Sequence, residues 1–239
     1  MRRLGLFAFL FLAALSFACA PAADTGSDTA EAEDTGGGED HEEGAETDER
    51  AAWSKPFEVY EFLEIGEGSR AVDLMAGGGY NAVRLAELVG SGGAAIVEGG
   101  NDELRGRVLD GDLQSMGNIE FVDDVYALAD ASVDVVLAVR AYHLFPDVPA
   151  VLAELHRALV PGGIVGIVEV RLNQDEGHDM QSHRMGEQTV ISDMAAAGFE
   201  YVGSSDLLRF DDDDYTVFAV EGRTRYMTDR MLLKFRKAE

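Results

Sequence analysis

A run of small residues near position 77 is the part of this chain best suited to binding a ligand. Residues 72–79 read Val-Asp-Leu-Met-Ala-Gly-Gly-Gly, an apolar strand that carries the acid Asp73 and ends in glycines. The turn consists of Ala76, Gly77, Gly78 and Gly79. Glycine permits positive φ and has no β-carbon to hold a ligand away. Because a helical pattern follows at once, the turn predicts a site where the polar end of a nucleotide-type cofactor meets a helix N-terminus.

Acidic residues end the next two predicted strands. Glu98 follows Gly77 by 21 residues, near the spacing at which an acid accepts hydrogen bonds from a ribose diol. Asp123 and Asp124 end the third strand, where a carboxylate can receive an adenine amino group. Ligands bind beyond the carboxyl ends of parallel strands, so these acids and Asp73 are predicted to line one cofactor site.

Polar residues after the fourth predicted strand are candidates for catalysis. Arg140, Tyr142 and His143 follow the apolar run 133–139. A histidine can remove a proton from an acceptor near neutral pH. It can equally be a structural histidine bonded to the backbone at the strand end. Arg140 can bind an anionic acceptor or a cofactor carboxylate, or it can pair with Glu169.

A second polar group follows the fifth predicted strand. Glu169 and Arg171 end that strand, and the pair His183-Arg184 is expected to converge on the same rim. His178, His183 and the acids near them are too loosely spaced for a metal site. We therefore expect a flexible polar lid there and no metal. The acidic run 211–214 is expected to form a solvated loop.

The elements that position these residues alternate between strands and helices. Such an order predicts an α/β fold, a doubly wound, Rossmann-like, mostly parallel seven-stranded sheet with an antiparallel C-terminal strand. Strands are predicted at 70–74, 94–97, 119–122, 133–139, 164–169, 199–202 and 230–235. Helices are predicted at 55–64, after the glycine turn, at 149–159 and at 189–197.

The first 19 residues look like an export signal. Arg2 and Arg3 precede an apolar run at 4–15, and Cys19, the only cysteine, follows within a stretch of small residues. The run is too short to cross roughly 30 Å of hydrocarbon. Cys19 stands where a lipoprotein signal places the acylated residue, although an ordinary cleaved signal also fits. We expect an exported, periplasmic-side protein that touches the membrane only through this signal or a lipid on Cys19.

Composition divides the rest of the chain in two. Residues 20–50 are rich in acids and contain no Leu, Ile, Val or aromatic residue, so they are expected to be a disordered linker. Residues 51–239 have the length and apolar content of one domain. The whole chain has 45 acidic and 19 basic residues, which argues against a nucleic-acid partner. We expect a small-molecule substrate; the sequence does not give the oligomeric state.

From Arg70 onward the chain resembles class I S-adenosylmethionine-dependent methyltransferases, whose first motif is an acid followed by Gly-x-Gly-x-Gly. The segment Leu-Val-Pro-Gly-Gly at 159–163, before the fifth strand, belongs to the same pattern. More narrowly, the chain is similar to a group of predicted exported methyltransferases. That group shares Arg-x-x-His at 140–143, His-Arg at 183–184 and Thr-Asp-Arg-x-x-Leu-Lys-Phe at 228–235.

The resemblance implies S-adenosylmethionine as the cofactor and methyl transfer to a small-molecule acceptor that the sequence does not identify. One position departs from the family pattern. Met75 stands where the family has its first glycine, so its side chain must point away from the cofactor or narrow the site.

Two other interpretations stay open at this point. One is a non-catalytic module that binds an adenosyl ligand or another metabolite on the same fold, since a fold alone does not establish a reaction. The other is a nicotinamide-dependent oxidoreductase, because Gly77-x-Gly79-x-x-Ala82 fits the dinucleotide fingerprint. The oxidoreductase is less favoured because the chain has no Tyr-x-x-x-Lys pair.

Overall fold

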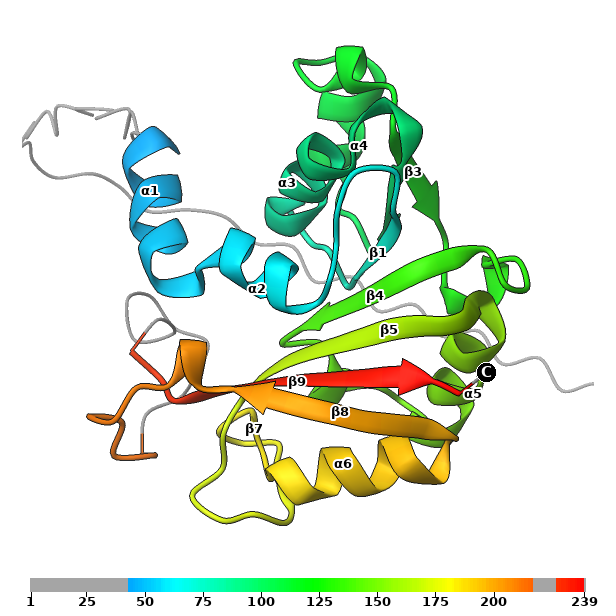
Figure 1. Cartoon of the computed structure of the whole chain (residues 1–239). Coiled ribbons are helices and arrows are strands. Elements are labelled where there is room, and N and C mark those ends of the chain that lie inside the picture. Colours follow the sequence, from blue (N-terminus) through cyan, green and yellow to red (C-terminus); the bar gives the residue numbers. More distant parts are fainter. Residues whose placement is uncertain (1–42, 217–226, 239) are drawn as a thin grey trace, which may run out of the picture. The chain divides into compact units, whose positions relative to one another are not determined.

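In the computed structural model, residues 43–216 and 227–238 are described, and all belong to one unit of the chain, Glu42–Glu239 (Figure 1). The predicted signal at 1–19 and most of the predicted linker lie outside these residues. Among the described helices, none is long and apolar enough to cross a membrane.

Strands and helices alternate along the described chain. The helices are α1 (Glu43–Ser54), α2 (Pro56–Phe62), α3 (Tyr80–Val89), α4 (Asp102–Leu109), α5 (Val148–Ala158) and α6 (Glu187–Ala196). The main-sheet strands are β1 (Arg70–Leu74), β2 (Ala94–Glu98), β3 (Ile119–Val122), β4 (Val133–Val139), β5 (Leu159–Val170), β8 (Phe199–Ser205) and β9 (Arg230–Lys237). A separate hairpin pairs β6 (His178–Asp179) with β7 (Arg184–Met185). Five 3₁₀ turns complete these residues: η1 (Gly90–Gly92), η2 (Gln114–Met116), η3 (Val125–Ala127), η4 (Tyr142–Leu144) and η5 (Asp206–Leu208).

The main sheet has seven strands in the order β3-β2-β1-β4-β5-β9-β8. Strands β3, β2, β1, β4 and β5 pair in parallel, and β9 runs antiparallel between β5 and β8. This confirms the predicted doubly wound sheet with an antiparallel C-terminal strand. The winding reverses between β1 and β4, where Asp73 lies beside Leu137. In such sheets, ligands bind beyond the carboxyl ends of the strands at that reversal.

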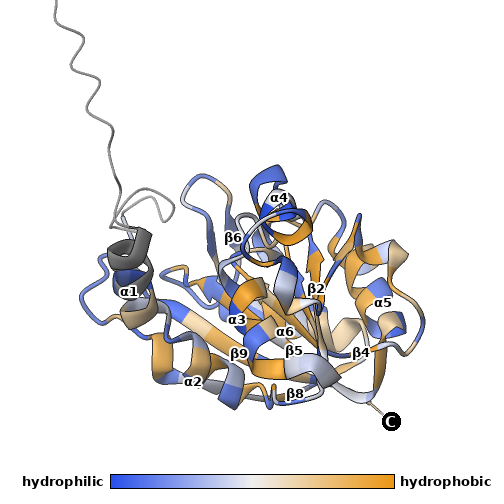
Figure 2. Ribbon diagram, turned by 90° about the horizontal axis from the view of Figure 1, so that it is seen from above, coloured by the Kyte–Doolittle hydropathy of each residue, from blue (hydrophilic) through white to orange (hydrophobic). Residues whose placement is uncertain are grey.

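Alternating side chains bury both faces of the sheet. Val72 and Leu74 of β1 pack into a core that includes α5 and α6, whereas Ala71 packs on the other side with α2 and α3. Successive strand residues point to opposite faces, so strands covered on both sides become almost wholly apolar. Figures 1 and 2 show helices on both sides of the sheet, and Figure 2 shows hydrophobic colour on strands and on helices such as α2 and α5.

Helix α1 begins at Glu43, inside the segment 20–50 that its composition predicts to be disordered. Tertiary contacts that composition does not reveal hold the end of this helix. The hydroxyls of Ser54 and Tyr80 lie 2.9 Å apart, and the carbonyl of Trp53 accepts a hydrogen bond from Arg230 at 2.6 Å. An acidic helix with little apolar surface is therefore ordered at its C-terminal end by the folded domain.

The polar lid expected near His183 is a short hairpin with a buried base. Arg184 is fully buried and makes two hydrogen bonds to Asp213, at 2.8 and 3.1 Å. Asp213 was expected in a solvated loop, and that expectation is wrong for this residue. Its carboxylate is buried because it pairs with a guanidinium that the sheet covers.

A steric test of the fold comes from the contact between α2 and β5. A β-carbon on Gly166 would lie 2.2 Å from Cδ1 of Leu63, which is fully buried. We expect Gly166→Ala to lower the free energy of unfolding by about 1–3 kcal/mol, because overpacking displaces α2. Leu63→Ala alone should cost about 2–5 kcal/mol through the cavity that it leaves.

In the Leu63→Ala background the added methyl group has room, so Gly166→Ala should then cost less than about 1 kcal/mol. Urea unfolding of the natural chain, the two single variants and the double variant measures this coupling between Leu63 and Gly166. Gly106→Ala is the matched control; nothing lies within 4 Å of its β-carbon position on α4, and it should stabilise by about 0.5–1 kcal/mol. An equal cost of Gly166→Ala in both backgrounds would show that Leu63 is not the clashing group.

Candidate active site

A cavity of about 230 Å³ lies at the reversal of the winding, beyond the carboxyl ends of β1 and β4. Asp73 and Ala76 line it from the first strand and its turn, and Arg140 and His143 line it from the segment after β4. His183, between β6 and β7, completes the same wall. The fold thus brings residues from three separate parts of the chain to one place.

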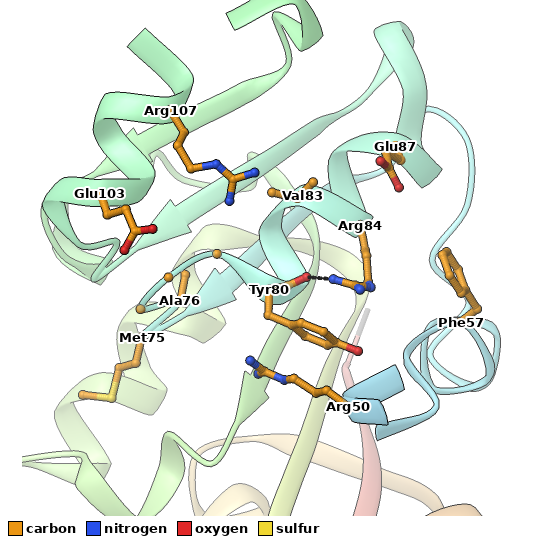
Figure 3. Close-up of a pocket in the computed structure, with 13 residues that line it drawn as sticks. Arg50, Phe57, Met75, Ala76, Tyr80, Val83, Arg84, Glu87, Glu103 and Arg107 are labelled. Atoms are coloured by element: carbon orange, nitrogen blue, oxygen red, sulfur yellow. Dashed lines mark hydrogen bonds between the residues drawn. The ribbon is translucent and has the colours of Figure 1, made fainter. Parts of the chain in front are cut away.

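A larger cavity of about 820 Å³ lies against the glycine turn, between α1, α3 and α4 (Figure 3). It shares Arg50, Met75, Ala76 and Tyr80 with the smaller cavity. The guanidinium carbons of Arg50 and Arg84 lie 3.6 and 3.7 Å from the centre of the Tyr80 ring, within cation–π range. The larger cavity thus extends along the glycine turn, whereas Asp73, His143 and His183 line the smaller one.

Three non-glycine residues on the wall of the smaller cavity adopt left-handed backbone conformations. Their φ angles are 52° for Met75, 55° for Arg140 and 55° for His183. Each such residue costs about 1–3 kcal/mol and persists only where the surrounding structure enforces it, which happens most often at functional sites. The strained backbone therefore indicates a functional site at the same cavity as the carboxyl ends of the strands do.

Asp73 carries the most perturbed carboxyl group of this site. It is only 1% exposed, and burial raises its pKa to about 7. The backbone N–H of Ala82, the positive charge of Arg50 and the side chain of Asn81 oppose that rise. Its Oδ2 atom has no hydrogen-bond partner among the described residues. A cavity-lining carboxylate with an unused acceptor oxygen can receive a donor group from a ligand.

The glycine turn has the close-approach geometry that its sequence predicts. Gly77 and Gly79 have φ of 54° and 81°, and a β-carbon on Gly79 would lie 2.5 Å from Leu104. Glu98 holds the turn by accepting a hydrogen bond from the Met75 N–H at 2.9 Å. The Met75 side chain is 41% exposed and lines both cavities, so it narrows the entrance.

The acids after β3 have different roles from one another. One carboxylate oxygen of Asp124 accepts the N–H groups of Tyr126 and Ala127, at 2.9 and 3.1 Å, and so caps η3. Asp123 is exposed beside it. Neither lines the two cavities above. Their contact with an adenine ring stays a prediction. Asp123 is the better candidate, because an oxygen of Asp124 already accepts the two hydrogen bonds that cap η3.

Tyr142 was predicted beside the reacting group, but its hydroxyl points elsewhere. The residue is 1% exposed and donates a hydrogen bond to Asp193 of α6 at 3.0 Å. Burial and the Asp193 carboxylate raise the pKa of its phenol above the ordinary value. Tyr142 therefore fixes η4 against α6 and does not face the cavity, which corrects the predicted role.

His143 lies in the cavity wall with both ring nitrogens engaged. Its Nδ1 atom is 3.0 and 3.1 Å from the two carboxylate oxygens of Glu169, and its Nε2 atom is 2.8 Å from Nδ1 of His183. Glu169, one of the partners that the sequence allowed for Arg140, is fully buried and bonded to His143. Burial, followed by the neighbouring His143 and Arg140 charges, lowers the pKa of His183.

Metal binding is not favoured by these side chains. Among the residues that the structure describes, no group of three or more His, Cys, Asp or Glu side chains is arranged to hold a metal ion. His178 and His183 lie near His143, as the sequence suggested, but His143 already has a partner at each nitrogen.

Sequence reasoning missed the contribution of Arg50. This residue lines both cavities and lowers the pKa of Asp73, yet it sits at the end of an acidic segment that composition marks as disordered. Asn81 was also missed; it accepts a hydrogen bond from Tyr60 at 3.0 Å and lies against Asp73. The position of Asn81 directly after the glycine turn was the signal in the sequence that could have identified it.

Comparison with known proteins agrees with this geometry. Residues 72–167 match the family model described as a methyltransferase domain. The fold is that of class I methyltransferases. Methyltransferase GfsG of Streptomyces halstedii is 29% identical over 120 residues, which are 47% of this chain and 42% of that protein. Demethylmenaquinone methyltransferase of Lactobacillus johnsonii is 30% identical over 126 residues, 49% of each chain. This chain therefore spans less than half the length of each of these curated relatives.

Solved structures place the same fold in proteins of low sequence identity. A SAM-dependent methyltransferase from Aquifex aeolicus superposes with a TM-score of 0.61 at 15% identity, covering 80% of this chain and 97% of that one. A Burkholderia thailandensis 1,6-didemethyltoxoflavin-N1-methyltransferase, solved with S-adenosylhomocysteine, gives 0.57 at 19%, covering 80% and 83%. The [4+2]-cyclase SpnF gives 0.62 at 19%, covering 79% and 82%. These three structures share the fold of this chain.

The buried carboxyl group of this methyltransferase fold makes stability depend on pH. Above pH 7 Asp73 is charged in both states, and the folded state bears the full cost of burying that charge. As pH falls below 7 the folded carboxyl takes up a proton, so the cost declines and disappears near pH 4. Asp73→Asn should therefore raise the free energy of unfolding by about 1–3 kcal/mol at pH 8 and by less at pH 5.

Urea unfolding at pH 5 and pH 8 measures the difference between Asp73→Asn and the natural chain. Asp123→Asn is the matched control, because that carboxylate is exposed and its removal should change little at either pH. A stabilisation by Asp73→Asn of equal size at both pH values would show that the carboxyl is not titrating near 7.

Proposed function

We propose that this protein transfers the methyl group of S-adenosylmethionine to a small-molecule acceptor. The observation that carries the proposal is the cavity at the winding reversal, where Asp73, with its unpartnered oxygen, and Ala76 of the glycine turn share a wall with His143. The methyltransferase-domain match, residues 72–167, covers the end of β1 and all of β4, the two strands that form this reversal.

The residues present fit the cofactor. The turn at 76–79 offers a close backbone approach, and Asp73 offers an anionic acceptor for the cationic amino-acid end. Glu98 uses one oxygen to hold Met75, which leaves its second oxygen to receive a ribose hydroxyl. When bound, S-adenosylmethionine supplies an electrophilic methyl group on a sulfonium sulfur.

The chain's own residues would position the acceptor and receive its proton. Alignment of the acceptor atom with the methyl group is the main requirement of such a transfer. Arg140, held in a strained backbone conformation on the cavity wall, supplies positive charge near the acceptor. The His143–His183 pair supplies ring nitrogens that can hold a proton. The smaller of the two cavities, with a volume of about 230 Å³, suits a small acceptor group.

Calorimetric titration with S-adenosylmethionine, S-adenosylhomocysteine and NAD, in separate runs, tests the cofactor. We expect micromolar binding of the first two ligands and none of NAD. Gly78→Asp should weaken adenosyl binding at least tenfold. Its φ is not in the left-handed region and the nearest atom to an added β-carbon is 3.9 Å away, so the new carboxylate enters the larger cavity without backbone strain.

Gly66→Asp is the matched control, because a β-carbon there meets nothing within 4 Å and the residue lies outside both cavities. It should bind the cofactor as the natural chain does. If none of the three ligands binds, the non-catalytic metabolite-binding module is favoured. If NAD alone binds, the oxidoreductase is favoured.

We also propose that the protein is exported and anchored by a lipid on Cys19, on the strength of the basic and apolar start of the chain. Expressed in a bacterium with two membranes, the full chain should fractionate with membranes and carry an acylated Cys19 by mass spectrometry. If an ordinary signal is enough for export, the Cys19→Ala protein should be found free in the periplasm. A cytoplasmic, unprocessed chain would contradict the proposal.

A further inference from the structure

The strained conformation of Met75 gains little from the rest of the fold. Its φ of 52° is one that glycine adopts readily and that costs free energy in any residue with a β-carbon. The Met75 side chain is 41% exposed and belongs to none of the hydrophobic clusters of the described core. Glycine would be the easier residue at this position, so packing within the fold does not explain the methionine.

The turn after β2 fixes the backbone at Met75. The Met75 N–H bonds to the Glu98 carboxylate at 2.9 Å, and the N–H of Ala76 bonds to the Glu98 carbonyl at 2.8 Å. Gly99 lies so close that a β-carbon on it would be 3.1 Å from Cα of Met75. The main chain therefore has little freedom to relax, and it holds the Met75 side chain where it lines both cavities (Figure 3).

Leu144 is a second large apolar side chain exposed at the smaller cavity. It is 42% exposed and lies in η4, the turn after β4. The hydrogen bond from Tyr142 to Asp193 holds η4 against α6, so the fold also sets the position of Leu144. Among the exposed large apolar side chains in the described parts of the chain, Met75 and Leu144 are the two that line this cavity.

Charged and polar side chains share the smaller cavity with this apolar pair. Asp73, Arg140 and His143 line it as well. Apolar surface beside a few polar groups suits a ligand that has an apolar body and a polar end. Exposed apolar side chains gain free energy when a ligand covers them, and the flexible methionine thioether makes favourable contacts with the edges of aromatic rings.

We propose that Met75 and Leu144 hold the apolar body of the methyl acceptor, and that this body is an aromatic ring with a polar substituent. The ring lies against the two apolar side chains, and its substituent faces the polar side of the cavity. The inference rests on the proposed methyl transfer and names the class of its acceptor. It makes Met75 and Leu144 specificity-determining residues and explains why the chain keeps a side chain at a position that favours glycine.

Carbon NMR of the methionine methyl groups tests the contact without turnover. The full chain, labelled at these methyl groups and saturated with S-adenosylhomocysteine, is titrated with phenol and separately with cyclohexanol, a non-aromatic alcohol of similar size. The ring current of phenol should displace the Met75 methyl signal. Cyclohexanol should cause no such displacement and should bind about fivefold more weakly. Met180, which is 55% exposed and lines neither cavity, supplies the control signal and should not respond.

Two variants test whether these side chains hold the ring. Calorimetry should show that Leu144→Ala and Met75→Gly each weaken phenol binding at least about fivefold, because each removes apolar contact. Leu109→Ala is the matched control for Leu144→Ala, since Leu109 is 62% exposed and lines neither cavity, and it should change nothing. Leu144→Ala should bind S-adenosylhomocysteine within about twofold of the natural chain. Met75→Gly should unfold at the same or a higher urea concentration, because glycine relieves the positive φ.

Three results would overturn the proposal. The first is a Met75 signal that does not respond to phenol. The second is a Met75 signal that moves with S-adenosylhomocysteine and no further with phenol, which would place the side chain on the cofactor. The third is unfolding of Met75→Gly at a lower urea concentration, which would show that the fold itself requires the side chain.

The same titrations separate this inference from the proposed function. Binding of S-adenosylhomocysteine without a phenol response at Met75 would reject the acceptor class alone. Failure of the natural chain to bind S-adenosylhomocysteine would reject the proposed methyl transfer, and a phenol response at Met75 would then show an aromatic-binding site without that reaction.

Discussion

The histidine wall of this cavity depends on one buried arginine. Arg184 follows His183 directly, is fully buried, and donates hydrogen bonds to Asp213 and to the Arg171 carbonyl at 2.9 Å. Asp213 in turn accepts the backbone N–H of Asp229 at 2.7 Å, at the start of β9. A guanidinium buried beside a matching carboxylate is costly to separate, because either partner alone would leave an unpaired charge in the core. The network therefore fixes the hairpin on the sheet end, and with it the position of the His183 ring.

Strain and buried charge occur together around the cavity. Met75 and Arg140 follow the neighbouring strands β1 and β4 directly and have positive φ. Asp73 on the cavity wall and Glu169 behind His143 are buried carboxyl groups. Each feature costs stability where it stands, and the doubly covered sheet supplies the burial that offsets it. This combination is typical of a site shaped for a ligand and explains why the chain keeps side chains there that weaken the isolated fold.

The same architecture supports different reactions, as the solved methyltransferases and the cyclase SpnF show. Function in this fold therefore comes from the groups placed around the shared cavity. Here those groups are an acid with an unused oxygen on the first strand, an arginine after the fourth, and two histidines in series with a buried glutamate.

The sequence by itself determined the sheet and the glycine turn, because both have local signals. These signals are the glycines of the turn and the apolar runs at 70–74, 119–122 and 133–139. It also brought Asp73 and His143 to one sheet edge, since parallel strands end together. Only the tertiary structure decided the partners: the Tyr142 hydroxyl bonds to Asp193 of α6, and Glu169 bonds to His143. Segments distant in sequence meet there, and which side chain faces which depends on packing that no local pattern encodes. For the same reason α1 forms within an acidic segment, because its contacts lie on the folded domain and not in its own residues.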